Sequence, residues 1–186
     1  MSNNILPGYF LNIREKLTVF NLPANFVDKP AGGGTCFLGG GTDLYVHQQD
    51  LLAGAEIDFL SDKVHLKSIL QQGEQCIMGA SVTVTDILES PIFQQYFPSL
   101  QKHMKLVSST QIRNMATFGG NIINGSPIGD LTIFFLALDA HLLLRDGMNV
   151  KLPLRNLFMG YKQLAKAVNT LIKFLFNYQG QVQIQF

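Results

Sequence analysis

The chain has 186 residues, of which 47% are hydrophobic, a length and composition that suit one domain or two small ones with a sizeable core. The 14 Lys and Arg residues nearly balance the 13 Asp and Glu residues, which argues against a nucleic-acid-binding protein because such proteins carry a clear basic excess. The sequence also lacks the polybasic run that would favour an anionic membrane surface.

Targeting and redox signals are few. The two cysteines, Cys36 and Cys76, form no C-x-x-C motif, so this chain alone would hold neither an iron–sulfur cluster nor a Cys-type zinc site. Sparse cysteines fit a reducing compartment, and we expect a cytoplasmic protein. The N-terminus lacks the basic and apolar regions of a signal peptide. The most apolar window, residues 131–144, is too short and too polar to span a bilayer, so no membrane association is expected.

In chain order, the first predicted element is a short helix over residues 11–20, whose apolar residues share one side. A Pro- and Gly-rich loop over residues 23–34 follows. Residues 35–38 are β-prone and lead directly into three glycines, residues 39–41. The Thr and Asp that come next are candidates to cap a helix over residues 42–52, and a strand that ends in such a turn is a plausible anion-binding corner.

A buried strand is predicted at residues 56–60. Because the pattern changes there to shorter β elements, we place a boundary at about residue 55. This divides the chain into an N-terminal α/β lobe, residues 1–55, and a larger α+β lobe, residues 56–186.

The larger lobe is expected to begin with two strands, residues 64–70 and 75–78, joined by a glycine turn. Helices are predicted at residues 86–89, after capping hydroxyl and carboxylate side chains, and shortly after Pro98, which suits a helix first turn.

The C-terminal third continues the mixture of elements. An apolar helix packed on most sides is predicted at residues 131–140, and a β-hairpin at residues 141–144 and 150–152. Residues 157–167 have helical spacing, and residues 172–186 are β-prone. The mixture predicts an α+β fold in two lobes, with the glycine clusters between them.

The most informative stretch is residues 110–130. It combines a Gly-Gly pair at residues 119–120 with the hydroxyl of Thr117 and the carboxylate of Asp130. Small residues let the backbone approach a ligand closely, and free N–H groups can point at an anion. The hydroxyl and carboxylate suit a ribose or ribityl chain. We therefore expect this stretch and residues 39–43 to converge on one phosphate-bearing cofactor.

Simpler interpretations stay open for each feature. Neither cluster is a P-loop or a G-x-G-x-x-G motif. Residues 39–43 could be a tight turn before a helix, and residues 119–120 a bulge or close backbone crossing. Arg113 could neutralise a phosphate or form a structural ion pair, and Asp130 could be a plain N-cap. The four histidines lack ligand spacing, and no serine has a nucleophile elbow, so neither a metal site nor a catalytic side chain is expected.

Two motifs carry a resemblance to a known family. Residues 39–44, G-G-G-T-D-L, resemble the A-G-G-T-D-L loop in the flavin domain of molybdenum hydroxylases, which include the FAD subunits of xanthine dehydrogenase and carbon monoxide dehydrogenase. Residues 111–131, which contain Q-I-R-N, A-T-F-G-G-N-I and S-P-I-G-D-L, resemble that family's second motif, and residues 77–83 continue the match. The resemblance extends over about residues 35–162.

The resemblance implies a vanillyl-alcohol-oxidase-like FAD-binding domain, with FAD held between two lobes. The separate C-terminal lobe common in the family is expected to be absent. The cofactor contacts that the resemblance implies are those of Phe37, Leu38, Gly39, Gly40, Gly41, Thr42, Asp43, Leu44, Val107, Thr117, Phe118, Gly119, Gly120, Asn121 and Asp130.

The resemblance also implies a function. The chain would be the FAD-binding electron-transfer component of an oxidoreductase, inactive without its partners. Those partners would be molybdopterin-binding and 2Fe-2S subunits or domains, with NAD or another acceptor receiving the electrons. The flavin performs such chemistry, which agrees with the lack of a catalytic side chain. Two alternatives stay open: a cofactor-free scaffold that kept the fold, and a site for a different phosphorylated ligand.

Overall fold

The chain falls into two compact units, Met1–Pro30 and Ala31–Phe186. The residues described by the computed structural model are 8, 12–18, 35–146, 148–165 and 171–177. The first unit contains α1 (Ile13–Thr18), which confirms a helix inside the predicted range. The loop expected at residues 23–34 and the last part of the predicted C-terminal strand, residues 178–186, lie outside the described residues.

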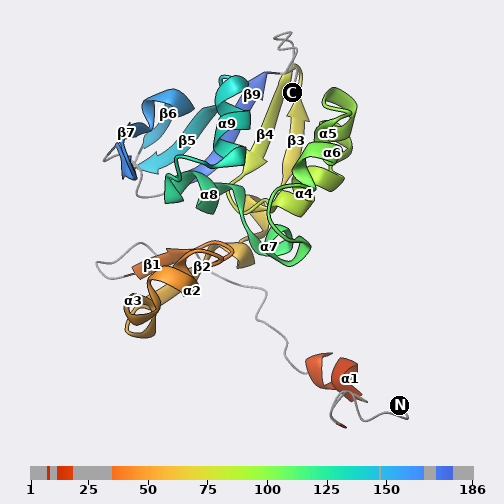
Figure 1. The fold of residues 1–186 in the computed structure, drawn as a ribbon, viewed down its shortest axis with the longest axis vertical. Coiled ribbons are helices and arrows are strands. Elements are labelled where there is room, and N and C mark those ends of the chain that lie inside the picture. The colour runs from red at the N-terminus through yellow and green to blue at the C-terminus, as the bar shows by residue number, and fades with distance from the viewer. Residues whose placement is uncertain (1–7, 9–11, 19–34, 147, 166–170, 178–186) are drawn as a thin grey trace. The chain divides into compact units, whose positions relative to one another are not determined.

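A small parallel sheet opens the second unit (Figure 1). It pairs β1 (Thr35–Leu38), which is confirmed as predicted, with β2 (Glu56–Phe59). Parallel neighbours need a crossover connection, and here it contains α2 (Leu44–His47) and α3 (Gln49–Ala53). The single helix predicted at residues 42–52 is therefore wrong, because the backbone leaves the helical region at Gln48 (φ −135°, ψ 39°).

The second strand of this sheet differs from its predicted burial. Its two middle residues are half-buried and its two end residues are exposed, so the expected buried strand is wrong in that respect. β2 also starts just after the boundary expected near residue 55, so the parallel pair uses residues from both sides of it. Lys63 and Asp58 form a partly buried ion pair of 2.8 Å that ties β2 to the turns after it.

The larger sheet has five strands, and every neighbouring pair is antiparallel. Its strands, in spatial order, are β3 (Ile69–Gln72), β4 (Gln75–Gly79), β9 (Leu171–Asn177), β5 (His141–Asp146) and β6 (Met148–Pro153). The last described strand therefore lies in the middle, between β4 and β5. The antiparallel pairing of β5 with β6 confirms the hairpin expected from residues 141–144 and 150–152, while its glycine lies outside the described residues.

Two predictions in this lobe need correction. The strand expected at residues 64–70 begins only at Ile69, because the chain first forms two short 3-10 turns, η2 (Leu60–Asp62) and η3 (Val64–Leu66). The helix expected at residues 157–167 is wrong within its described part. After η4 (Leu154–Asn156), the chain forms a small antiparallel hairpin, β7 (Phe158–Gly160) and β8 (Gln163–Leu164). Lys162 turns it with a φ of 52°, which ends any helix.

Six short helices connect β4 to β5. They are α4 (Val84–Glu89), α5 (Pro91–Tyr96), α6 (Leu100–Met104), α7 (Thr110–Met115), α8 (Phe118–Asn124) and α9 (Asp130–Ala137). Hydroxyl side chains cap four of them, which explains why the chain can start a new helix so often. Thr83 and Asp86 form a reciprocal capping box at α4, as their spacing predicted in part.

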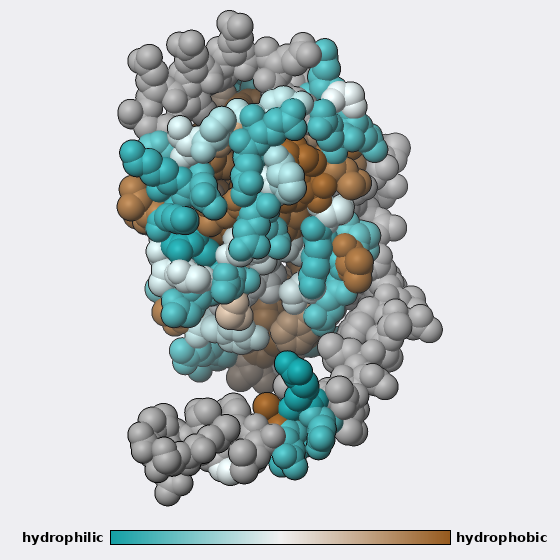
Figure 2. Space-filling view, turned by 90° about the vertical axis from the view of Figure 1, so that its right-hand side faces the viewer, coloured by the Kyte–Doolittle hydropathy of each residue, from teal (hydrophilic) through white to brown (hydrophobic). Residues whose placement is uncertain are grey.

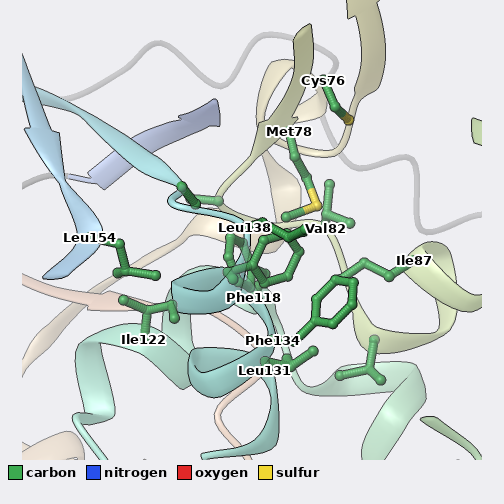
Figure 3. Close-up of a cluster of buried hydrophobic side chains, with 14 of the residues drawn as sticks. Cys76, Met78, Val82, Ile87, Phe118, Ile122, Leu131, Phe134, Leu138 and Leu154 are labelled. Atoms are coloured by element: carbon green, nitrogen blue, oxygen red, sulfur yellow. The ribbon is translucent and has the colours of Figure 1, made fainter. Parts of the chain in front are cut away.

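The core lies between these helices and one face of the five-stranded sheet (Figure 3). Alternate strand residues point into it, among them Cys76, Met78, Leu142 and Leu144, as period-2 alternation requires. The helices contribute an aromatic cluster, in which Phe118 and Phe135 have ring centroids 4.2 Å apart. The fully buried Phe118 is the first residue of α8, so the core fixes the start of that helix.

Figure 2 shows the face of α5 and α6, where hydrophilic residues dominate and hydrophobic ones interrupt them in a few places. The apolar α9 is less enclosed than predicted, because Ile133 is largely exposed. Across the described ranges, none of the helices has the length and apolar character needed to cross a membrane.

Candidate nucleotide-binding site

The first glycine loop, residues 39–41, follows β1 directly. Gly41 has a φ of +70°, a left-handed conformation that favours glycine, and a Cβ there would collide with the ring of Tyr45. The carbonyl of Gly41 accepts the N–H of Tyr45 at 3.0 Å, which connects the loop to α2. The loop is therefore a tight turn before a helix, as one interpretation of the sequence held.

The backbone amides of this loop are the hydrogen-bond donors that a ligand could use. Among the described residues, no protein acceptor receives the backbone N–H groups of Gly39, Gly40 or Thr42. Consecutive free amides in a turn form an anion-binding concavity without needing a lysine. The loop therefore has the donors that a phosphate group would need.

The second glycine motif, residues 117–121, uses its amides differently. Phe118 donates to the carbonyl of Val82 at 2.8 Å, and Gly119 donates to that of Ala80 at 2.9 Å. The Thr117 side chain caps α8 by accepting the N–H of Gly120 at 3.2 Å. The free amides expected here are therefore already engaged within the protein.

Gly119 is a close backbone crossing, which was one of the open interpretations. A Cβ on Gly119 would lie 2.7 Å from the carbonyl oxygen of Ala80, closer than real Cβ atoms approach. Gly120 is different, because it is exposed and its Cβ would meet only the Thr117 hydroxyl, at 3.0 Å. Of the pair, Gly120 alone presents its surface outward.

The two glycine regions lie against each other, as predicted. A Cβ on Gly39 would lie 2.5 Å from Thr117 Oγ1, and a Cβ on Gly40 would overlap the carbonyl oxygen of Met115. Only glycine permits this backbone contact at residue 40. Residues that are far apart in the sequence therefore form one corner, with the free amides of the first loop beside the start of α8.

Two buried polar atoms lack a partner among the described residues: Oδ1 of Asn121 and Oγ1 of Thr132. Buried polar atoms are nearly always hydrogen-bonded, so each such atom needs an explanation, for which a ligand or water is a candidate. Asn121 belongs to the predicted contacts and is the central residue of α8. Thr132 lies in α9, beside Gly129, and was not among the predicted contacts.

The other predicted contacts in the first lobe have mainly structural surroundings. Leu38 is 1% exposed, so its side chain belongs to the core. The Phe37 ring lies 6.0 Å from Lys63 Nζ. Asp43 precedes α2 without a side-chain cap, contrary to expectation, and its Oδ1 lies 3.7 Å from Nε2 of His47. Leu44 begins α2 and is half-buried.

Asp130 and Val107 complete the predicted set. Asp130 is exposed and is the first residue of α9, whereas Gly129 is the N-cap, so the plain N-cap interpretation is wrong. Within the described ranges, Asp130 makes no hydrogen bond to either glycine region. Val107 is half-buried against the core.

Arg113 makes structural hydrogen bonds in place of the ion pair that one interpretation gave it. Its guanidinium is buried and donates to backbone carbonyls of residues 105–108 and to the hydroxyl of Thr110. Both Nη groups therefore donate to the chain itself, and in the described part of the chain no carboxylate forms an ion pair with them.

Other reactive groups do not gather near this corner. In the described ranges, no group of three or more His, Cys, Asp or Glu residues could hold a metal ion. Burial raises the pKa of the Cys76 thiol to about 12, because desolvation disfavours the thiolate. That thiol is therefore a protonated core residue at neutral pH.

A glycine corner with free amides, on an α+β scaffold, offers the donors that suit a phosphate-bearing ligand. Residues 24–175 match the protein family described as the FAD binding domain in molybdopterin dehydrogenase. The chain therefore belongs to this family, whose cofactor is FAD, as the resemblance of its motifs predicted.

Individual proteins that resemble this chain belong to the same kind of enzyme. The carbon monoxide dehydrogenase medium chain of Hydrogenophaga pseudoflava is 34% identical over 97 residues, 51% of this chain and 33% of that protein. The xanthine dehydrogenase FAD-binding subunit of Escherichia coli O157:H7 is 31% identical over 118 residues, 61% of this chain and 40% of that protein. A solved carbon monoxide dehydrogenase from Hydrogenophaga pseudoflava, lacking the Mo-pyranopterin moiety of its cofactor, aligns with a TM-score of 0.70 and 26% identity, over 78% of this chain and 52% of that one. The chain thus spans about a third to a half of these relatives.

Proposed function

We propose that the chain binds FAD at the glycine corner and acts as the electron-transfer component of a molybdenum-hydroxylase-type oxidoreductase. The observation that carries the proposal is the contact of Gly39 with Thr117 and of Gly40 with Met115. It brings the two family motifs to one place on the molecule. Bound FAD would supply exchange of electrons between a reduced donor and an oxidised acceptor.

The residues present fit such a cofactor. The first glycine loop offers amides of Gly39, Gly40 and Thr42 that no acceptor within the described ranges receives. Such amides offset phosphate charge through dipoles, so the site does not depend on the guanidinium of Arg113, whose Nη groups donate to the chain. The unpartnered Oδ1 of Asn121 is an acceptor for a ligand hydroxyl or amide. In this proposal the first loop holds the diphosphate, and the second motif holds the neighbouring part of the cofactor.

The wider assembly is also a proposal. The relatives' names indicate subunits of larger dehydrogenases, so we expect partners that carry the molybdopterin and 2Fe-2S centres, with NAD or another acceptor receiving the electrons. The chain would be inactive without them. The two-lobed, vanillyl-alcohol-oxidase-like arrangement would then place the cofactor between the lobe of the parallel β1–β2 sheet and the lobe of the five-stranded sheet.

The proposal is tested by adding FAD to the purified chain and following flavin fluorescence and visible absorption. We expect saturable binding and a rise in Tm, because a ligand that binds only the folded state stabilises it. FMN, NAD and ADP serve as comparison ligands. A folded protein that binds none of these ligands would favour the cofactor-free scaffold. A protein that binds FMN, NAD or ADP more tightly than FAD would favour a site for a different phosphorylated ligand.

A further inference from the structure

Arg113 makes an unusual set of contacts for a buried cation. It is 9% exposed and lies on α7. Its Nη1 donates to the carbonyls of Lys105 at 3.2 Å, Val107 at 2.8 Å and Ser108 at 2.8 Å. Its Nη2 donates to Oγ1 of Thr110 at 2.8 Å. One guanidinium therefore holds the whole 105–108 turn, the segment between α6 and α7.

The turn needs such a donor. The carbonyls at the end of α6 already accept the N–H groups of residues 105–107, whereas the carbonyls of Lys105, Val107 and Ser108 accept no backbone N–H among the described residues. Ser108 has a φ of 53°, which is costly for a residue other than glycine and persists only where its surroundings enforce it. A guanidinium presents five N–H donors in a planar fork, a geometry that lysine does not have.

α7 connects this turn to the nucleotide corner. The helix ends at Met115, whose carbonyl oxygen occupies the place that a Cβ of Gly40 would take. Thr117, two residues further, contacts Gly39 and caps α8. A shift of the six-residue α7 therefore moves the surface on which the first glycine loop rests.

We propose that Arg113 is a positioning residue for the nucleotide site. It fixes α7 against the 105–108 turn and, through the Met115 carbonyl, keeps the first glycine loop in its ligand-binding conformation. In this proposal Arg113 itself does not touch the ligand, since both of its Nη groups donate to the chain. This inference rests on the proposed binding of FAD.

The test compares Arg113→Lys and Arg113→Met with the unaltered chain. FAD affinity and the visible spectrum of bound flavin are measured well below the Tm of each protein, and the Tm without ligand is recorded separately. We expect Arg113→Met to raise the Kd for FAD about tenfold or more and to shift the flavin bands, with Arg113→Lys intermediate. The matched control is Arg155→Met, because Arg155 forms a 3.0 Å ion pair with Asp139 in which both side chains are over half exposed. It should leave the Kd unchanged.

The outcomes separate the two proposals. If the unaltered chain binds no FAD, the proposed function fails and this inference falls with it. If the unaltered chain binds FAD and a folded Arg113→Met binds it equally well with the same spectrum, a lower Tm would mark a purely structural role and overturn the inference.

A milder variant covers the case in which Arg113→Met does not fold. Thr110→Val removes only the acceptor of Nη2. We expect a smaller rise in the Kd for FAD and faster hydrogen exchange at the Ala116 N–H, which donates to the Ile112 carbonyl at the end of α7. Faster exchange without any change in the Kd would contradict the positioning role.

Discussion

The two glycine regions look alike in the sequence and differ in what their backbones do. The first loop, residues 39–41, leaves the amides of Gly39 and Gly40 without an acceptor among the described residues. In the second motif, residues 117–121, the amides of Phe118 and Gly119 bind carbonyls of the neighbouring segment, residues 80–84. The first region is therefore available to a ligand, and the second builds the wall beside it.

Glycine serves close approach in both regions, but toward different neighbours. In the first loop Gly40 lies against the Met115 carbonyl, so the contact joins the two regions. In the second, Gly119 lies against the Ala80 carbonyl, so the contact belongs to the scaffold of the larger lobe. The comparison implies that substitutions at these glycines should separate damage to the site from damage to the fold.

The largest effect is expected for Gly40→Ala. Its methyl group would overlap the backbone oxygen of Met115, which no side-chain rotation can relieve. We expect a loss of about 4 kcal/mol or more in the free energy of unfolding, or separation of the loop from α7 with loss of FAD binding. Urea denaturation followed by circular dichroism, together with FAD titration, measures both.

The control for this substitution is Gly54→Ala. A Cβ on Gly54 meets nothing within 4 Å, and its φ is −107°, which alanine accepts. It should change the free energy of unfolding by no more than about 0.5 kcal/mol, the usual range for surface substitutions. Equal behaviour of the two variants would show that the contact between Gly40 and Met115 does not exist in solution.

A smaller but purely structural effect is expected for Gly119→Ala. The added methyl lies 2.7 Å from the Ala80 oxygen, so the segment must move and strain the hydrogen bond between the Gly119 N–H and that oxygen. We expect a cost of about 2 to 3 kcal/mol, measured without ligand by the same denaturation. A variant as stable as the unaltered chain, with only FAD binding lost, would reverse the roles assigned to the two regions.

The sequence predicted the structure of the first glycine loop better than that of the second motif. The strand at residues 35–38 was predicted correctly, because β-prone runs and turn glycines are local signals. The contacts of Gly39 and Gly40 agree with the expected convergence of the two clusters, but that expectation came from the ligand chemistry assigned to both and not from a local signal. The engagement of the amides of Phe118 and Gly119 was not predicted, because their acceptors, Val82 and Ala80, are distant in the sequence. Local patterns indicate that a backbone can approach something closely, but they do not say whether that is protein or ligand.

The wrong helices have similar causes. Residues 42–52 carry a helical pattern, yet the crossover between parallel strands bends at Gln48. Residues 157–167 have helical spacing, but the buried Leu157 and the left-handed Lys162 commit the chain to a hairpin. The role of Arg113 was missed for the same reason, since its carbonyl acceptors lie in a turn whose conformation no short pattern records. Tertiary contacts override propensity at each of these places.

The contact between the first loop and the second motif, formed by Gly39 and the Thr117 hydroxyl, is tested by Thr117→Ala. Its hydroxyl caps α8 through the Gly120 N–H, and removal of such a cap costs about 1 kcal/mol. Gly39→Ala should cost a similar amount, because its methyl would lie 2.5 Å from that hydroxyl. In the double variant the obstructing oxygen is gone, so the two costs should not add. A double-mutant cycle in urea measures this coupling, and simple additivity would show that the two residues do not touch.

The smallest effect on stability is expected for Gly120→Ala, which is also the sharpest test of the site. Gly120 is exposed within α8, where alanine is favoured over glycine by about 1 kcal/mol, and its methyl would meet only the Thr117 hydroxyl at 3.0 Å. The gain in helix propensity and the cost of the close contact with the Thr117 hydroxyl nearly cancel, so the Tm without ligand should barely change. The outward methyl would nevertheless occupy space beside the free amides of the first loop, and FAD should bind more weakly. Unchanged FAD affinity in this variant would mean that the cofactor approaches the first loop without touching α8.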